Sequence, residues 1–224
     1  VSGFDTPATD WYRSLRMSSS PSAPLAMLFG GASPDEGPDP FAEKILDAAF
    51  EQFRLLGIRR SSVDDIAKRA GVGRVTVYRR FETKDKLVQA LLLRETMRSV
   101  ERVDARTSQP ERVEDRMVEA FVAAMEEVRN HPLLLALLRT EPETILPLLT
   151  VKASMGLAFA RTYVSNKMQE SRRELGLPDV NLDPVAEIFA RLSLSMLLTQ
   201  RTSIPVDDEE QTRAFARRHI LPMV

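Results

Sequence analysis

The chain has 224 residues, and its 43% hydrophobic content is enough to build a substantial core in one large domain or two small ones. Lys and Arg together number 31 and Asp and Glu 32, so any positively charged surface for nucleic acid must be local. Because there is no cysteine, disulfides, thiolate metal sites and cysteine nucleophiles are excluded, as fits a reducing cytoplasm. The longest apolar runs fall far below the roughly 20 residues of a membrane-spanning helix, so we expect no membrane segment.

Residues 1–38 are rich in Pro, Ser, Gly and Ala and have no helical or strand period. This composition predicts a disordered amino-terminal arm. Arg13 and Arg16 precede a short apolar stretch and faintly resemble a signal peptide, but the stretch is too short and begins with Pro24. We therefore expect a cytoplasmic protein.

The sequence changes character at Asp39, where the first of four helices is predicted. Asp39 can cap the helix, Pro40 suits its first turn, and Gly57 should end it. The apolar residues that follow at helical spacing are Ile45, Leu46, Ala49, Phe50, Phe53 and Leu56. These residues are the candidate core of the helix.

Three further helices are predicted in close succession. One runs from a Ser62 cap to Ala70, with Val63, Ile66, Ala67 and Ala70 buried. Gly71 supplies a turn, and the next helix begins near Gly73 or Arg74 and reaches Arg80. The fourth follows a Thr83 cap and continues to about residue 106. The amino-terminal domain is therefore predicted over residues 39–87, with its fourth helix extending beyond.

Long helical patterns resume after a polar break at Ser108–Pro110, and no strand signal appears. The predicted helices are Glu111–Asn130, Pro132–Arg139, Glu143 to about Leu175, Asp183–Thr202 and Asp207–Leu221. We predict an all-α protein, in which a three-helix amino-terminal bundle precedes a larger helical domain over residues 111–224.

The segment Ser62–Phe81 has the features of a helix-turn-helix. Small Ala67 allows two helices to approach closely, Gly71 can adopt the left-handed turn conformation, and Val72 can fill the space between the helices. Val77 and Phe81 should face the same core. The opposite face carries Arg74, Val75, Thr76, Tyr78 and Arg79. That face could enter a DNA major groove.

The local charge agrees with this interpretation. Residues 39–87 hold eleven Lys or Arg and eight Asp or Glu, a net charge of 11 − 8 = +3 within a chain of net −1. The positive field that attracts phosphates would come from this patch and not from the whole molecule.

The segment from about Phe41 to Leu93 resembles the DNA-binding domain of TetR family transcriptional regulators. The matching positions are Ser62, Ile66-Ala67, Ala70-Gly71-Val72, Thr76, Tyr78, Phe81 and Lys84. The resemblance covers about a quarter of the chain. It implies that Ser62, Tyr78 and Lys84 touch phosphates and that Thr76 and Arg74 read base edges. Gly73 and Val75 depart from the family's usual Ser and small residue, so the operator sequence cannot be carried over.

The predicted DNA-binding site contains Ser62, Arg74, Val75, Thr76, Tyr78, Arg79 and Lys84. An alternative for Tyr78 is a structural role, in which its ring covers the helix junction. A basic but functionally incidental three-helix core is the corresponding alternative for the whole motif.

Methionine and phenylalanine side chains at helical spacings suggest an adaptable apolar pocket in the second domain. The candidates are Met117, Phe121, Met125, Met155, Phe159, Phe189 and Met196. The resemblance implies a ligand cavity between these helices, and the few charges on their faces favour a mainly hydrophobic effector. Ordinary core packing is the alternative.

Residues Val185–Leu198 are apolar on nearly all sides, which exceeds the single stripe that one core contact requires. Together with Phe215, Ile220 and Leu221 they resemble the dimer interface of the family. A twofold dimer would present two recognition helices to a palindromic operator. Burial within one protomer remains the alternative.

The sequence thus predicts a repressor that leaves its operator when an effector changes the spacing of the recognition helices. We expect no enzyme activity, cofactor or metal, because no catalytic constellation is evident and His131 and His219 lack metal-ligand spacing. The rival interpretations are a helical enzyme or a dimeric adaptor with a vestigial helix-turn-helix.

Overall fold

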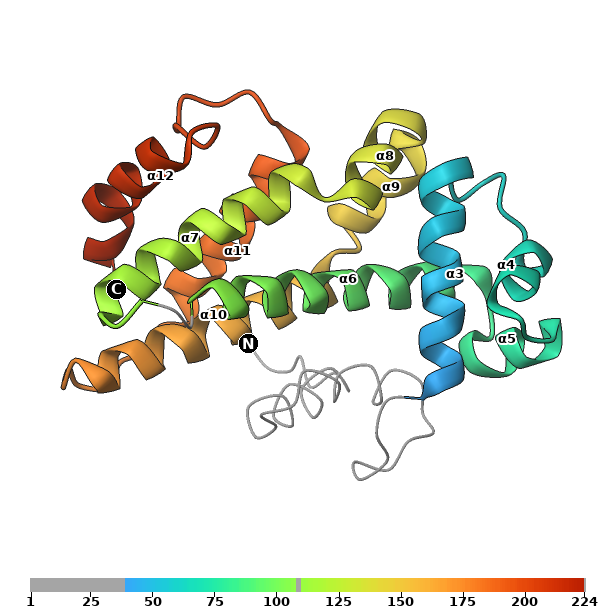
Figure 1. Ribbon diagram of the computed structural model, residues 1–224, viewed down its shortest axis with the longest axis horizontal. Helices are drawn as coiled ribbons and strands as arrows, with labels where there is room; N and C mark the ends of the chain where they lie inside the picture. The colour runs from blue at the N-terminus through green and yellow to red at the C-terminus, as the bar shows by residue number, and fades with distance from the viewer. Residues whose placement is uncertain (1–38, 108–109, 224) are drawn as a thin grey trace, which may run out of the picture. The chain divides into compact units, whose positions relative to one another are not determined.

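The computed structural model describes residues 39–107 and 110–223, and the predicted disordered arm lies outside these residues (Figure 1). The described residues form helices and connecting turns without a strand, which confirms the all-α prediction. The α-helices are α3 (Pro40–Leu56), α4 (Val63–Ala70), α5 (Arg74–Phe81), α6 (Lys84–Thr107), α7 (Val113–Asn130), α8 (Pro132–Thr140), α9 (Pro142–Leu149), α10 (Ser154–Glu174), α11 (Asp183–Leu198) and α12 (Glu209–Phe215). A π-helical turn, η1 (Ala216–Ile220), and a 3₁₀ turn, η2 (Leu221–Met223), follow α12.

The chain divides into two compact units within α6. The amino-terminal unit ends at Arg94, and the carboxy-terminal unit begins at Glu95. Each unit has its own buried apolar side chains.

The helices of the amino-terminal unit begin and end at local signals in the sequence. Asp39 caps α3 by accepting a hydrogen bond from the Phe41 amide at 3.0 Å. Gly57, with φ 82°, ends that helix. Ser62 and Asp65 form a reciprocal capping box at the start of α4, and Gly71 ends α4 in the left-handed conformation (φ 67°, ψ 31°). These signals fix where α3 and α4 stop and therefore how α5 is presented.

The core of the amino-terminal unit joins α3, α4, α5 and the first turns of α6. Its fully buried large side chains are Ile45, Leu46, Phe53, Ile66, Val77, Phe81, Leu87 and Leu91. Three predicted core residues differ, because Phe50 and Ala70 are only half-buried and Leu56, in the last turn of α3, is exposed. Arg94 is also buried, and its guanidinium pairs with Asp47 at 2.9 Å and Glu43 at 3.3 Å on α3.

In the carboxy-terminal unit, α7 packs against α10, α11 and α12, and α10 and α11 pack along each other (Figure 1). A buried cluster of Val118, Phe121, Met125, Met196 and Ala216 lies where α7, α11 and the end of the chain meet. Phe189, Phe215 and Ile220 cover this cluster, so part of the apolar surface predicted for a dimer is used within the protomer.

The prediction of one helix from Glu143 to about Leu175 is wrong, because the structure contains two helices there, α9 and α10. Pro147 lies inside α9, and the Thr150 hydroxyl donates to the Leu146 carbonyl at 2.7 Å where α9 ends. Proline supplies no amide and the threonine takes up a helix carbonyl, so the hydrogen-bond ladder ends before α10 starts.

Helix α11 is shorter than predicted, and the last predicted helix is only in part an α-helix. α11 ends at Leu198, because Thr199 is extended, and α12 gives way to the π turn after Phe215. No single described helix is long and apolar enough to cross a membrane; α9 and α10 meet that test only as a pair bent by 49°.

Candidate nucleic-acid interface and ligand cavity

Helix α5 has one buried face and one exposed face. Val77 and Phe81 are 2% and 1% exposed and hold the helix in the core, as predicted. On the other side Val75 is 79% exposed and Tyr78 37%. Arg74 and Arg79 are also exposed, and Thr76 is half-buried. A short helix with basic, hydroxyl and apolar groups on its free face can meet both phosphates and base edges.

The side chain of Arg74 is held in place by two neighbours. Its Nη1 lies 2.8 Å from Oδ2 of Asp64 on α4, and its guanidinium carbon lies 5.3 Å from the centroid of the Tyr78 ring. An ion pair and a cation–π contact together restrict the planar guanidinium fork. Sequence reasoning missed Asp64, because nothing in the pattern indicated that an acidic residue ten positions away would face Arg74.

Ser62 and Lys84, predicted to touch phosphates, make contacts within the unit. The Ser62 hydroxyl accepts from the Asp65 amide at 3.1 Å and donates to the Asp65 carboxylate. Hydrogen bonds from the Ser62 side chain and backbone lower the pKa of Asp65. The Lys84 ammonium donates to the Ile58 carbonyl. Ser62 therefore caps α4, and Lys84 joins the start of α6 to the turn after α3, whatever else these residues contact.

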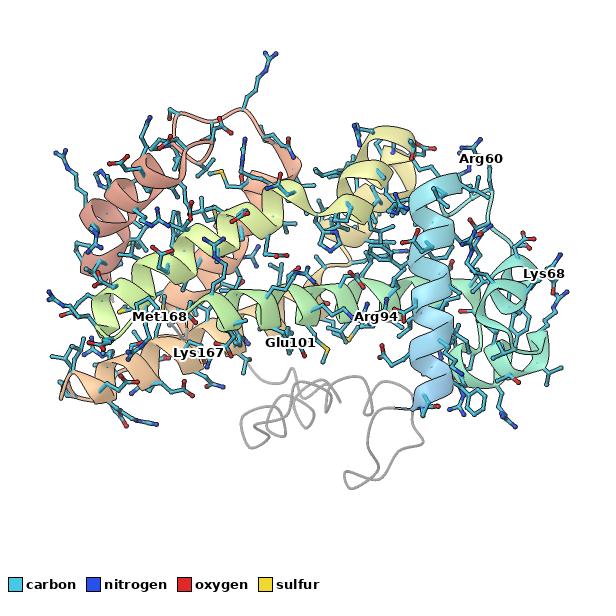
Figure 2. The ribbon with its side chains drawn as sticks, viewed as in Figure 1. Arg60, Lys68, Arg94, Glu101, Lys167 and Met168 are labelled. Carbon is cyan, nitrogen blue, oxygen red and sulfur yellow. The ribbon has the colours of Figure 1, made fainter. Side chains whose placement is uncertain are left out.

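Exposed cations also flank this surface. Lys68 lies on α4 and Arg60 in the turn before α4, and both are labelled in Figure 2. Arg60 is anchored by a hydrogen bond from its Nε to the Leu56 carbonyl at 3.0 Å. The positive patch predicted from composition is therefore at the surface.

The carboxy-terminal unit contains a cavity of about 710 Å³, lined by α6, α7, α10, α11 and the end of the chain. This volume is within the roughly 300–1,000 Å³ that is usual for small-molecule sites. Ala216, Ile220 and Leu221 contribute to its wall, so the π turn borders the cavity.

Four of the seven residues predicted for a ligand pocket line this cavity: Met117, Phe121, Met125 and Phe189. Met155, Phe159 and Met196 do not, so the prediction was wrong for these three. Met196 is used in the buried cluster, and Met155 and Phe159 lie in the first two turns of α10, whereas the cavity begins at Ala160.

Polar groups on the cavity wall were missed from the sequence. The Tyr163 hydroxyl donates to Oδ1 of Asp104 at 2.9 Å, and Lys167 Nζ lies 3.1 Å from the same oxygen. Burial and the nearby Asp104 carboxylate raise the pKa of Tyr163. Lys167 and Met168 are labelled on α10 in Figure 2. Tyr163 and Asp104 are 59 positions apart, so only the fold brings them together.

The two histidines do not form a metal site. His131 is buried, caps α8 by accepting from the Leu134 amide, and has a pKa lowered by burial. The His219 ring lies against that of Phe215, with centroids 4.8 Å apart. Across residues 39–107 and 110–223, no three His, Asp or Glu side chains are arranged to hold a metal ion.

Two helices joined at a left-handed glycine, with the second helix exposing a basic face, define a helix-turn-helix of the DNA-binding class. Residues 45–91 match the family model described as bacterial regulatory proteins, tetR family. An HTH-type transcriptional regulator of Mycobacterium tuberculosis, from strains H37Rv and CDC 1551, is 28% identical over 184 residues, which cover 82% of this chain and 85% of the relative. Residues 45–91 are therefore a helix-turn-helix domain of the tetR type, and over most of its length the chain is similar to an HTH-type transcriptional regulator.

Solved structures agree with this fold over most of the chain. The TetR family repressor AlkX from Dietzia sp. strain DQ12-45-1b is 20% identical and has a TM-score of 0.58, covering 83% of this chain and 95% of AlkX. The regulator FadR from Bacillus subtilis in complex with stearoyl-CoA is 17% identical, has a TM-score of 0.51, and matches 81% of this chain and 96% of FadR. At these identities the likeness supports the fold alone.

Proposed function

We propose that the protein is a repressor that binds a palindromic operator as a homodimer and is released by a small, mainly hydrophobic effector. The observation that carries this proposal is the free face of α5, which lies opposite the buried Val77 and Phe81. Its exposed residues are Arg74, Val75, Tyr78 and Arg79. The 710 Å³ cavity in the other unit supports the proposal that a small-molecule effector binds there.

In the proposed complex, residues of α5 divide the work of DNA recognition. Arg74, Val75 and Thr76 meet base edges, where a guanidinium pairs with guanine and a methyl group packs on a thymine methyl. Arg79 and Tyr78 contact phosphates, together with Ser62 and Lys84, and set the register of the helix on the duplex.

The dimer surface is proposed along the exposed side of α11. Ile188 is 55% exposed there, whereas the neighbouring Phe189 covers the buried cluster of the protomer. Val185, one turn before Ile188, is half-buried, whereas Leu192 packs against the same buried cluster as Phe189. Twofold pairing of this stripe would bury it and supply the second recognition helix that a palindrome requires.

Effector and DNA would be coupled through α6. This helix starts at Lys84, directly after the recognition helix, and its second half lines the cavity from Thr96 to Thr107. A ligand that prefers one position of this half would shift the population of DNA-competent dimers.

The first experiment measures binding of the full chain to DNA flanking its own coding region by fluorescence anisotropy over a salt series. We expect specific binding that weakens steeply with salt, because phosphate contacts release counterions. Arg79→Ala should weaken binding and reduce the slope of log K against log[salt] by about 1. Arg201→Ala, an exposed arginine between α11 and α12, is the matched control and should leave both unchanged.

Two results would contradict the proposal. An Arg79→Ala slope equal to that of Arg201→Ala would remove α5 from the DNA interface. A monomer by sedimentation, unaltered by Ile188→Asp, would remove the dimer and with it the palindromic operator.

A further inference from the structure

Two polar groups of the cavity wall, Tyr163 and Asp104, both present hydrogen-bond acceptors. The Tyr163 proton is directed at Asp104 Oδ1, 2.9 Å away, so the lone pairs of the phenol oxygen remain to accept hydrogen bonds. Burial, and next the Asp104 carboxylate, raise the pKa of Tyr163, so the phenol stays protonated at neutral pH. A ligand that reaches this part of the wall therefore meets oxygen atoms that accept hydrogen bonds.

The cations on the cavity wall are already held by carboxylates of the same wall. Lys167 Nζ lies 3.1 Å from Asp104 and 3.4 Å from Glu170. Arg116 pairs with Glu174 and also donates to the Glu111 carbonyl at 2.9 Å. An anionic ligand would compete with these carboxylates for the same cations.

The charges that line the cavity add to this bias. Four carboxylates, those of Asp104, Glu127, Glu170 and Glu174, line the cavity with two cations, Arg116 and Lys167. Glu127 is paired with Arg102, and with that cation counted the net charge of these groups is 3 − 4 = −1. The remainder of the wall is largely apolar, with Met117, Phe121 and Phe189 among its members. The potential of such a wall favours positive or neutral groups.

We infer that the effector is an apolar molecule that ends in a hydrogen-bond donor, a hydroxyl or an ammonium group, and carries no negative charge. Its apolar body lies along α7 and α11, and its donor reaches Tyr163 and Asp104. This inference rests on the proposed function only in taking the cavity as the effector site. It separates this cavity from one suited to a polyanionic acyl-CoA.

The test titrates the full chain by calorimetry with three probes of one chain length, namely decylamine, 1-decanol and decanoate, each below its critical micelle concentration. We expect the amine to bind at least tenfold more tightly than the carboxylate, by an order-of-magnitude estimate. The ammonium gains a charged hydrogen bond with Asp104, whereas the carboxylate of decanoate has no donor to offer there. The relative affinity of the amine and the alcohol then shows whether the donor group of the effector is an ammonium or a hydroxyl.

Two variants assign the preference to these atoms. Asp104→Asn should reduce the ratio of amine to carboxylate affinity about tenfold, because it removes the charge that pairs with the donor. Glu101→Gln removes an identical charge from α6 at an exposed position that does not line the cavity, and it should leave the ratio unchanged (Figure 2). Thermal unfolding of both variants shows whether the fold is retained.

The outcomes separate this inference from the proposed function. Decanoate binding as tightly as decylamine, an unchanged ratio in Asp104→Asn, or no binding of any probe would overturn the inference and leave DNA binding untouched. Preferential binding of the amine without any change in operator affinity would support the inference and overturn the proposed coupling.

Discussion

The two units of this chain use their apolar residues in different ways. In the amino-terminal unit Phe53, Ile66 and Phe81 are almost completely buried, and short turns lock α4 and α5 together. In the carboxy-terminal unit Leu133 and Ile145 are equally buried, but Met117 and Phe189 are only half-buried and border a cavity of about 710 Å³. A surface that reads DNA needs side chains in fixed positions, whereas a sensor needs space that a ligand can fill. The difference in packing agrees with the two tasks that we propose for these units.

The largest expected effect is on the filled core. Phe81→Ala should lower the free energy of unfolding of the amino-terminal unit by about 3–5 kcal/mol, since Phe81 is 1% exposed and its removal leaves a cavity. Met117→Ala on the cavity wall should cost clearly less. Hydrogen exchange read by mass spectrometry resolves the two units; equal losses of protection would contradict the contrast between them.

A second prediction adds volume instead of removing it. Ala49→Leu enlarges a fully buried position on α3 and should destabilise the amino-terminal unit by about 1–3 kcal/mol. Ala160→Leu makes the same change at the cavity wall, where the added atoms have room, and should cost less than about 0.5 kcal/mol.

The same pair of variants has a binding readout. Ala160→Leu should weaken decylamine binding because it occupies ligand volume, whereas Ala49→Leu should leave the affinity unchanged if the chain remains folded. A large loss of stability in Ala160→Leu would mean that the space next to α10 is not available to a ligand.

The sequence allowed most of the amino-terminal unit to be predicted because its signals are local. Asp39, Gly57, Ser62 and Gly71 end or begin helices through contacts within a few residues, and each was predicted correctly. The free face of α5 follows from the helical period once Val77 and Phe81 are placed in the core.

The carboxy-terminal unit could be predicted less well because its features depend on distant partners. An apolar residue at helical spacing can face either a core or a cavity, so Met196 and Phe189 looked alike in sequence although only Phe189 lines the cavity. The contact of Tyr163 with Asp104 joins α10 to α6, and no local sequence pattern predicts it.

A pH experiment sharpens the comparison, since both histidines lie in the carboxy-terminal unit. Burial lowers the pKa of His131 below 6.5, although Glu95 opposes this and Arg102 and Glu127 are also close. The unfolded chain therefore takes up the proton first, so the stability is complete above about pH 6.5 and falls as the pH drops from there towards the folded pKa. The slope should not exceed about 1.4 kcal/mol per pH unit.

Urea denaturation at several pH values measures this slope, and His131→Asn, which can still cap α8, should flatten it. His219→Asn is the control and should retain the slope. If His131→Asn keeps the wild-type dependence, other groups produce it.

The smallest effect on stability is expected for the ion pair between Asp64 and Arg74, whose loss should mainly change DNA binding. Asp64→Asn removes an exposed ion pair with Arg74, which should change the free energy of unfolding by less than about 0.5 kcal/mol. Because Arg74 then loses a restraint and the DNA-facing surface loses a negative charge, binding to unrelated DNA should strengthen while the preference for the operator declines.

Glu51→Gln, which breaks the Arg54 pair on α3, changes the net charge equally and controls for the charge alone. In an Arg74→Ala background the effect of Asp64→Asn on operator preference should vanish, because a positioning residue acts only through the side chain that it positions. An effect of Asp64→Asn that persists without Arg74 would instead place the carboxylate itself at the DNA.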